Sequence, residues 1–447
     1  MENLSTQEAK QIAEEAYVFG YPFVMNYRSH YMVTINEASP FFKAPFNYIV
    51  HDTKPADHTR KDVVAMNGDT PYSNFGFDLR AEPVVISVPD VPDRYYVMQF
   101  VDFYTHNFAY IGTRATGTKA GDYLLVGPKW QGEIPEGKFN EVFHCETDFG
   151  GVICRTQLKG LDDLENMIAI QQGYKITPLS VFIGEVPKSA PLVDWPDWDP
   201  AMVTSLNFIT LLNFLLPFYQ PYHPDDMPVM ARLEKIGIAA GKKFNADELE
   251  PDTRQAIQAG FEAGLKKITY KTENIGTKVN GWNMTDAIGP REFFNGDWLL
   301  RAAAAQAAMY MNDKIEAFYP LVFVDAYGET LDAQANKYIL HFEKENIPAA
   351  KYFWSVTMYD KSADGTTGYM VANPIDRYLI NSTTEGLIYS EDGSLSIYIQ
   401  HEQPEGEKAA NWLPAPDAPF YMCMRIYGPE ESVMNNEWEP PAVERMQ

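Results

Sequence analysis

The chain has 447 residues, of which 45% are hydrophobic and 14% aromatic, and its formal net charge of −25 comes from 36 Lys and Arg against 61 Asp and Glu. This length exceeds what one hydrophobic core usually supports, so two or three domains of about 100–200 residues each are expected. Because nucleic-acid binding depends on basic groups that contact phosphates, the acidic balance excludes nucleic acid as an expected partner.

The number of cysteines and the lengths of the apolar segments indicate in which cellular compartment the protein is expected. Cys145, Cys154 and Cys423 are too few for a disulfide framework and form no CxxC pair, so buried free thiols are favoured over a bond between Cys145 and Cys154. No apolar run reaches the roughly 20 residues of a membrane span, and the N-terminus lacks the basic and apolar regions of a secretion signal. The sequence as given predicts a soluble cytoplasmic protein, or a secreted or periplasmic one if a signal peptide has been removed.

Residues 1–60 are expected to form a helix and its lead-in to the first domain. Ser5 and Glu8 fit a capping box, and apolar residues recur at helical spacing from Ile12 to Phe23. Pro22 is expected to kink or end this helix, because proline lacks the backbone N–H that a helix interior uses.

Residues 61–180 are predicted to form a β-domain, because short strand-like runs alternate with proline and glycine, as in an antiparallel β-sandwich. In residues 94–102 both alternating faces are largely apolar, so this strand is expected to be covered on both sides. Asp102 ends that run on an apolar face and needs a partner, for which Arg114 is a candidate.

The middle of the chain, residues 181–320, is predicted to hold a proline-rich linker followed by a helical module. An apolar stripe with helical spacing crosses residues 257–268. The alanine-rich segment 297–310 indicates a buried helix that approaches its neighbours closely.

Strand patterns return in residues 321–447, with alternation at 353–359, 394–400 and 420–426 and a hairpin signal at Asp392-Gly393. These strands are enough for a C-terminal β-sandwich or jelly roll. The predicted fold class is therefore mixed α and β and multidomain, with an N-terminal antiparallel β-sandwich, a helical middle module and a C-terminal β-sandwich or jelly roll.

The sequence motifs of common enzyme classes are absent. There is no GxSxG elbow, HExxH pair, Walker loop, GxGxxG fingerprint or EF-hand loop. The eight histidines form no HxH or HxxxH pair, so a histidine-rich metal site would have to be assembled from distant segments. No metal and no cofactor is assigned from the sequence.

The most polar stretch framed by apolar runs is 67–72, where Asn67, Asp69, Thr70 and Tyr72 carry an amide, a carboxylate, a hydroxyl and a phenol. Two interpretations stand side by side. Asn67-Gly68 is a favoured hairpin turn, and the polar side chains can serve that turn. Alternatively, the same groups line a cleft where a β-layer ends.

Two further groups combine acids, bases and cations. Asp102, His106 and Arg114 lie within reach of one hairpin, for which ion pairing at a strand end is favoured over a functional site. Arg377 can clamp a carboxylate with its two-pronged guanidinium, or it can pair with Asp376 or a neighbour in a turn, and the turn is favoured.

In residues 353–359 the two faces of a predicted strand differ. Trp354 has the parity of core residues, whereas Phe353, Ser355, Thr357 and Tyr359 form a polar and aromatic face. Such a face suits sugar rings, and it also suits an ordinary exposed sheet.

These stretches coincide with family motifs. In the first half of the chain the motif residues are Asn67, Asp69, Thr70, Tyr72, Asp78, Leu79, Pro89, Arg94, Tyr95, Asp102, Gly112, Arg114, Gly127, Pro128 and Gln171. In the second half they are Phe353, Trp354, Ser355, Tyr359, Asp360, Asn373, Pro374, Arg377, Tyr378, Asp392, Gly393, Asn411, Trp412, Arg425 and Tyr427. With these motifs the chain resembles the bacterial proteins that join two domains catalogued as unknown-function 1254 and unknown-function 1214.

The resemblance spans nearly the whole chain and implies the same order of β-sandwich, helical middle and jelly roll, with no assigned activity. In that family position 68 is not fixed as glycine. The resemblance therefore shifts the weight at 67–72 from turn geometry to the side chains of Asn67, Asp69, Thr70 and Tyr72.

Our leading hypothesis is a cleft between two β-modules that binds a small polar or sugar-like molecule, with or without chemistry performed on it. Asp69 and Asp102 are the candidate acids or bases, since two carboxylates in unequal environments permit acid–base work. The candidate binding residues are Asn67, Thr70, Tyr72, His106, Arg114, Trp354, Tyr359, Arg377 and Tyr378. The alternative is a non-catalytic β-sandwich protein with a role in glycan binding, at a surface or in an assembly. No oligomeric state is assigned.

Overall fold

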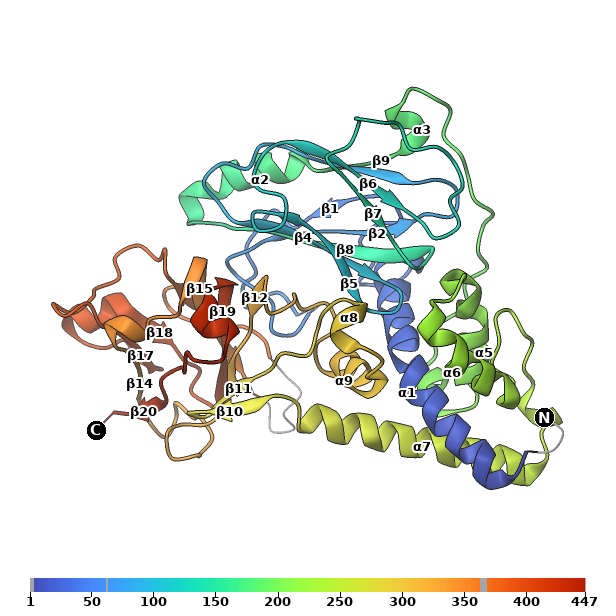
Figure 1. Cartoon of the computed structure of the whole chain (residues 1–447). Coiled ribbons are helices and arrows are strands. Elements are labelled where there is room, and N and C mark those ends of the chain that lie inside the picture. The colour runs from blue at the N-terminus through green and yellow to red at the C-terminus, as the bar shows by residue number, and fades with distance from the viewer. Residues whose placement is uncertain (1–3, 62, 362–367, 447) are drawn as a thin grey trace.

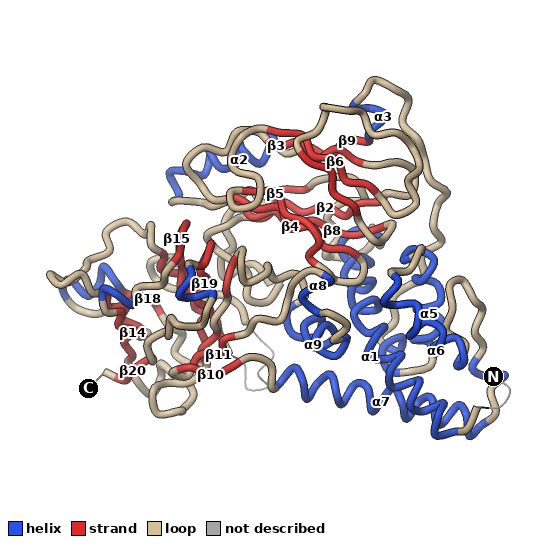
Figure 2. Tube along the Cα trace, viewed as in Figure 1, coloured by secondary structure: helices blue, strands red, loops and turns tan. Residues whose placement is uncertain are grey.

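The computed structural model describes residues 4–61, 63–361 and 368–446. Figure 1 shows three parts: an N-terminal β-module at the top, a helical module at the right and a C-terminal β-module at the left. The same division follows from secondary structure in Figure 2, where the strands gather in the two β-modules and most of the helices gather in the third part. The chain is thus mixed α and β, with its strands in two separate regions.

The N-terminal β-module is built from nine short strands of the described residues. They are β1 (Val50–His51), β2 (Tyr72–Asp78), β3 (Val84–Val88), β4 (Tyr96–Asp102), β5 (Asn107–Gly112), β6 (Gly121–Val126), β7 (Glu141–His144), β8 (Phe149–Thr156) and β9 (Lys175–Pro178). One sheet has the order β1-β2-β8-β4-β5 and the other the order β7-β6-β3-β9. All pairs are antiparallel except β6 with β7. Helices α2 (Leu164–Gly173) and α3 (Leu179–Phe182) flank β9 along the chain.

A single apolar core lies between these two sheets. Phe77 and Met98 reach it from the first sheet, and Ile86 and Leu125 reach it from the second. Strand β4 is buried along its whole length, which confirms the expectation that both of its faces are covered. Its second face packs elsewhere, because Val97 joins residues of the C-terminal β-module.

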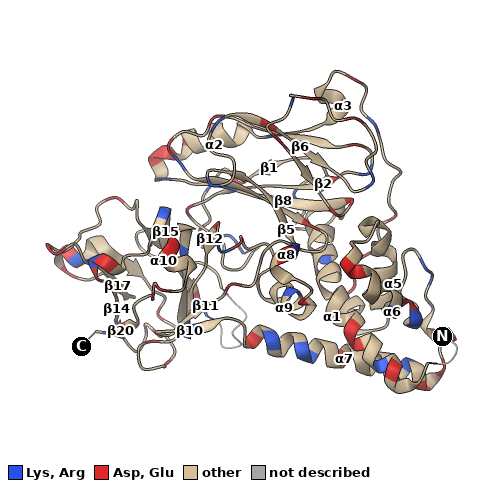
Figure 3. Cartoon of the chain, in the orientation of Figure 1, with Lys and Arg blue, Asp and Glu red and all other residues tan. Residues whose placement is uncertain are grey.

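The helical module contains α1 (Thr6–His30) together with helices from the middle of the chain. These are α4 (Ala201–Thr204), α5 (Asn207–Leu215), α6 (Met227–Leu233), α7 (Pro251–Glu273), α8 (Arg291–Phe294) and α9 (Trp298–Ala308). The predicted stripe on α7 and the alanines of α9 are buried in the core that they share with α1. Figure 3 shows both acidic and basic residues along α7, and the buried apolar residues of this helix belong to the core shared with α1.

Helix α1 begins with the expected capping box, in which the Ser5 and Glu8 side chains each bond the other residue's backbone N–H. Pro22 does not end the helix, since α1 runs on through it to His30. Aromatic contacts hold the helix on both sides of the proline: Phe19 and Phe23 pack against each other, and Arg301 lies over both rings. This packing outweighs the loss of one backbone hydrogen bond.

The C-terminal β-module also has two sheets. Its strands are β10 (Thr277–Val279), β11 (Trp282–Met284), β12 (Ala317–Phe318), β13 (Leu321–Val322), β14 (Tyr338–Phe342), β15 (Ala350–Asp360), β16 (Leu379–Asn381), β17 (Leu395–Gln400), β18 (Trp412–Pro414), β19 (Phe420–Pro429) and β20 (Val443–Arg445), and the short helix α10 (Glu431–Met434) follows β19. The larger sheet has the order β10-β11-β13-β19-β15-β16 with β12 also paired to β19, and the smaller has the order β18-β17-β14-β20. The predicted strands at 353–359, 394–400 and 420–426 are confirmed as β15, β17 and β19.

The two faces of β15 behave as the alternation predicts. Trp354 and Val356 enter the core of the C-terminal β-module. Phe353 and Tyr359, on the opposite face, are buried in two smaller clusters. The polar and aromatic face of β15 is therefore not an exposed sheet surface, because it lies against the N-terminal β-module. We call this contact region the joint.

The structure also describes the Asp392-Gly393 turn, the three cysteines and the lengths of the helices. Asp392-Gly393 does form a turn, with Gly393 at a φ of +88°, but of its two flanks only β17 is a described strand. Cys145, Cys154 and Cys423 are buried and unbonded to one another. Among the helices that the structure describes, none has both the length and the apolar character needed to cross a bilayer.

Candidate functional site

The polar stretch 67–72 runs directly into β2 and lies at the joint. Gly68 does not adopt the left-handed conformation that a two-residue hairpin turn of this kind requires. A Cβ atom at Gly68 would lie 2.9 Å from Leu379 Cδ2 and 3.2 Å from Met370 Cε. Glycine is used here because the loop approaches the C-terminal β-module closely, so the hairpin-turn interpretation is not supported.

Side chains of the C-terminal β-module bind the backbone of the two residues that precede this loop and the side chain of its first residue. The Tyr359 hydroxyl donates to the Met66 carbonyl at 2.6 Å, and Arg425 Nη2 donates to the Ala65 carbonyl at 2.7 Å. The Asn67 amide donates to Thr70 Oγ1 at 2.6 Å and to the Tyr427 hydroxyl. Strands β15 and β19 thus fix the position of the stretch that the sequence singled out.

Asp69 is the unusual member of this group. Its side chain is buried, and neither carboxylate oxygen has a hydrogen-bond partner among the described residues. Ser355 is also buried, and its hydroxyl has no partner either. Ser355, Asn381 and Asn67 lie close enough to the carboxylate to lower its pKa, although none of them meets the geometry of a hydrogen bond. Two polar groups without partners therefore lie next to each other in the joint.

The protonation of Asp69 reflects this environment. Burial raises the pKa of Asp69 above its ordinary value, because a carboxylate loses hydration in the interior. The Arg425 guanidinium opposes this rise by favouring the ionised form. Arg425 is itself held by Thr357 Oγ1 and the Tyr359 hydroxyl, each at 2.9 Å. A carboxyl group with a raised pKa beside a fixed cation can donate or accept a proton.

Arg155 on β8 forms a second centre in the joint. Its guanidinium lies 5.4 Å from the centre of the Tyr72 ring and donates to Gln99 Oε1 at 2.8 Å. It also donates to Asn312 Oδ1 at 3.3 Å. Asn312 and Tyr319 line a cavity of about 30 Å³, which is room for one or two water molecules.

Arg155, Arg425 and Ser355 are not among the site residues predicted from the sequence. A signal for the two arginines was present, since each stands alone within an apolar strand, at residues 149–156 and 420–429. A buried guanidinium must find partners, so an arginine at such a position marks a polar centre inside a fold.

Arg114 takes part in a third centre, and the expected pair with Asp102 is not formed. Arg114 is bound to Glu316, which also accepts a hydrogen bond from the Tyr95 hydroxyl at 2.7 Å. Nearby, Asp313 accepts from Asn107 at 2.6 Å and from the Tyr110 hydroxyl at 2.8 Å. Burial raises the pKa of Asp313 to about 6.

Asp102 and His106 lie together at the far end of β4. The backbone N–H of His106 donates to Asp102 Oδ1 at 2.8 Å, and His106 Nδ1 lies 3.3 Å from Asp102 Oδ2. Asp102 therefore finds its partner four residues along the chain. This pair contacts α1 through Asn26, which donates to the Asp102 carbonyl at 3.0 Å.

The binding residues predicted in the C-terminal β-module lie in different parts of the structure. Trp354 packs against Phe342 in the core. Arg377 Nη1 donates to the carbonyls of Ala410 and Trp412, both at 2.9 Å, so it fastens its loop to the start of β18. The Tyr378 hydroxyl is 2.7 Å from His58 Nδ1, at the edge of the cluster that contains Tyr359. Of these residues Tyr359 is the one that reaches Arg425 and the 67–72 loop.

Comparisons with known proteins agree with the sequence motifs. The profile described as a protein of unknown function, DUF1254, matches residues 46–178, and that of DUF1214 matches residues 316–431. The chain is similar in structure to the VPA0106 protein from Vibrio parahaemolyticus, with 22% identity, 98% of this chain and 100% of that chain covered, and a TM-score of 0.79. An uncharacterized protein from Burkholderia cenocepacia is similar with 12% identity, coverage of 99% and 95%, and a TM-score of 0.44. No curated protein matches the chain.

Proposed function

Because this chain belongs to the proteins that join DUF1254 to DUF1214, we propose that one site, built by both regions at the joint, binds a small polar or sugar-like molecule. Asp69 comes from the first region, and Ser355 and Arg425 come from the second. Within this proposal each pair of packed sheets is a β-sandwich, the second of jelly-roll type. The shared core between the sheets of each module supports that description.

The observation that carries the proposal is the pair of buried polar groups without partners, the Asp69 carboxylate and the Ser355 hydroxyl. Buried polar groups in native proteins are almost always hydrogen-bonded, so each exception needs a reason. Ordered water is one such reason, because a water molecule could form hydrogen bonds with both groups if the joint had only a structural role. A ligand is favoured because the exception coincides with a raised pKa and a buried cation, the combination typical of functional sites.

The chemistry of the site defines the ligand class. Asp69 can accept a hydrogen bond from a ligand hydroxyl or, when protonated, donate one, and Ser355 can do both. The rings of Tyr359 and Tyr427 border the same region, where they stack on Tyr421 and Phe353 respectively and make its wall apolar. If the site performs chemistry, Asp69 is the general acid or base and Arg425 stabilises negative charge that develops on the substrate.

The alternative of a glycan-binding or assembly surface receives less support. A flat sugar platform needs aromatic side chains on an exposed sheet face. In the described residues, the large hydrophobic side chains that are exposed all lie outside the strands. Phe353 and Tyr359 of β15 and Tyr427 of β19 are buried at the joint instead.

A ligand panel tests the proposal. The full chain is screened by thermal shift against sugars, polyols and small hydroxy acids, together with the variants Asp69→Asn and Ser355→Ala. A ligand present at about 100 times its Kd adds about 2.7 kcal/mol to the free energy of unfolding, so the melting temperature must rise. We expect a compound that stabilises the native chain and loses its effect in both variants. The exposed-site variant Glu133→Gln is the control and keeps the full shift.

Two outcomes would reject the proposal. The first is a panel in which no compound raises the melting temperature of the native chain. The second is a stabilising compound whose shift is unchanged in Asp69→Asn and Ser355→Ala, because its site would then lie outside the joint.

A further inference from the structure

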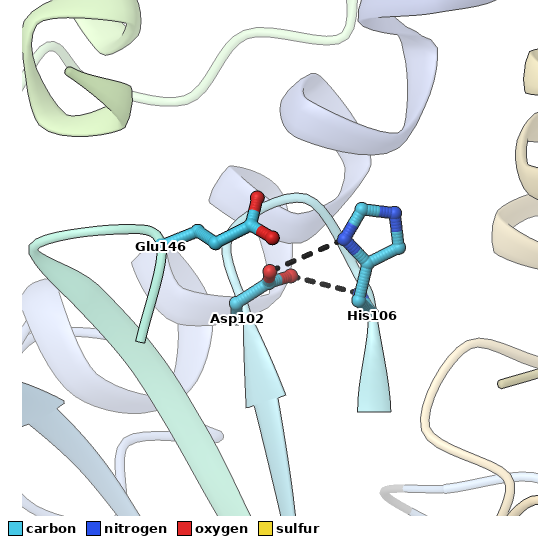
Figure 4. A group of neighbouring side chains, drawn as sticks. All are labelled: Asp102, His106 and Glu146. Carbon is cyan, nitrogen blue, oxygen red and sulfur yellow. Dashed lines mark hydrogen bonds and ion pairs between the residues drawn. The ribbon is translucent and has the colours of Figure 1, made fainter. Parts of the chain in front are cut away.

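A second group of functional side chains lies at the opposite end of β4, next to the helical module. Figure 4 shows Asp102 at the end of β4, His106 just before β5 and Glu146 in the loop between β7 and β8. The three side chains converge from these separate segments. One potential metal-ligating atom from each lies within 4.8 Å of the others.

This spacing is close to that of a coordinated ion. Ligand atoms bonded at about 2.1 Å to one metal are at most about 4.2 Å apart. Only one of the three pairs can lie at that limit, because ligands at tetrahedral or octahedral angles are about 3–3.4 Å apart, so the three atoms would approach one another by up to about 1–2 Å on binding an ion. Glu146 is the most exposed of the three, with 34% of its side chain exposed against 1% for Asp102.

The charges around the group do not balance when His106 is neutral. Three carboxylates, those of Asp102, Glu146 and Asp226, face two guanidinium groups, those of Arg291 and Arg301. One negative charge remains. Arg291 forms an ion pair with Asp226 Oδ2 at 3.1 Å, although the contact lacks hydrogen-bond geometry. An added cation is thus electrostatically favoured in this part of the fold.

Neighbouring groups also hold the candidate ligands in place. Arg291 Nε donates to both oxygens of Glu146, at 2.9 and 2.8 Å, and fixes the plane of the carboxylate. The His106 ring stacks on Tyr104, with the ring centres 5.5 Å apart and the planes at 19°. Metal-binding carboxylates and imidazoles are commonly oriented by such outer contacts. Each carboxylate oxygen has two lone pairs, so Glu146 can accept from Arg291 and bind a metal at once.

We propose that Asp102, His106 and Glu146 form a binding site for a divalent transition-metal ion. One imidazole nitrogen with two carboxylate oxygens suits Mn²⁺, Fe²⁺, Co²⁺ or Zn²⁺ better than Mg²⁺ or Ca²⁺, which prefer oxygen alone. The remaining coordination positions open on the side of Glu146, the most exposed of the three. This site is separate from the joint and does not depend on the function proposed there.

The test uses Mn²⁺ and Co²⁺ as probes. The full chain is freed of metal with a chelator, and Mn²⁺ binding is measured by isothermal titration calorimetry and by the loss of the free-ion electron paramagnetic resonance signal. The main variant is Glu146→Gln, whose amide oxygen still accepts from Arg291 and whose fold is checked by circular dichroism. The matched control is Glu343→Gln, because Glu343 lies 3.5 Å from His341 in an exposed pair that lacks the buried carboxylates.

We expect one Mn²⁺ per chain, an affinity at least tenfold lower in Glu146→Gln and an unchanged affinity in Glu343→Gln. With Co²⁺ we expect visible absorption bands that His106→Gln abolishes. Absence of saturable Mn²⁺ binding by the native chain would overturn the proposal. Equal affinity in the native chain and in Glu146→Gln would overturn it as well, since the ion would then be bound elsewhere.

Discussion

Asp69 and Ser355 come from different β-modules, lie side by side at the joint, and are both buried without a hydrogen-bond partner. The lysine-bound carboxylate of Asp148 provides a contrast within the same chain. Burial raises its pKa as well, yet it forms an ion pair with Lys129. The two aspartates therefore compare a buried carboxylate in a direct ion pair with one that has a cation nearby but forms no ion pair with it.

The first prediction follows from this contrast. Asp69→Asn is expected to raise the free energy of unfolding at neutral pH by about 1 kcal/mol. Asparagine has nearly the same shape as aspartate, and the substitution removes a poorly solvated charge. Since the folded-state pKa of Asp69 is raised, the gain is expected to shrink as the pH falls and the native carboxyl becomes protonated. Asp148→Asn, which breaks the pair with Lys129, is expected to destabilise the chain. Urea unfolding at pH 7 and pH 5 measures the change in unfolding free energy of both variants. A loss of stability in Asp69→Asn would contradict the prediction.

The second prediction concerns Asp313, whose pKa is raised to about 6 by burial. The folded chain then binds this proton more tightly than the unfolded chain, so stability is highest below the ordinary pKa and falls as the pH rises to about 6. The contribution is at most about 3 kcal/mol. Asp313→Asn keeps an oxygen for Asn107 and Tyr110 and does not titrate. The difference in unfolding free energy between native and variant chains is therefore expected to change between pH 4 and 6 and to be constant above pH 7.

The third prediction addresses the joint itself. Tyr359→Phe removes the donor to the Met66 carbonyl and one acceptor for Arg425, so we expect a loss of about 1–2 kcal/mol of unfolding free energy. Tyr398→Phe, on a partly exposed position of β17, is the control and is expected to cost less than about 0.5 kcal/mol. Chemical denaturation of both variants provides the comparison. Similar losses in the two variants would argue against a stabilising role for the Tyr359 hydroxyl.

The fourth prediction compares two glycines at close contacts. A Cβ at Gly260 of α7 would lie 2.5 Å from the Lys10 carbonyl of α1, whereas at Gly68 the nearest atom is the flexible end of Leu379 at 2.9 Å. Helix propensity alone would make Gly260→Ala stabilising by about 1 kcal/mol. Because the backbone of α1 cannot yield locally, we expect a loss of about 2–3 kcal/mol instead, against about 1 kcal/mol for Gly68→Ala. Thermal unfolding ranks the two variants.

Local patterns predicted local structure well. The double apolar faces of residues 94–102 predicted that β4 is covered on both sides, and the alternation in 353–359 separated Trp354 from Tyr359 correctly. Both results depend on side chains of one strand, whose direction is fixed by its backbone. The identity of the covering partner could not be predicted, because it is another module contributed by residues 200 or more positions away.

Contacts between segments far apart in the sequence could not be predicted. Arg114 was assigned to Asp102 because the two are close in sequence, but its partner is Glu316. The polarity of residues 67–72 predicts Asp69 as a site residue. The residues that affect the pKa of its carboxyl group, Ser355 and Arg425, belong to another module. Pro22 shows a different limit, since tertiary packing overrides a local rule.

Helix α1 lies at the start of the chain but buries its aromatic face against α5, α7 and α9, which are synthesised some 200 residues later. During translation the N-terminal β-module therefore emerges complete while α1 still lacks most of its partners. Such an exposed apolar face invites association with chaperones or with other nascent chains. A chain shortened to end near residue 180 is expected to precipitate, and removal of residues 4–35 from that fragment is expected to restore its solubility.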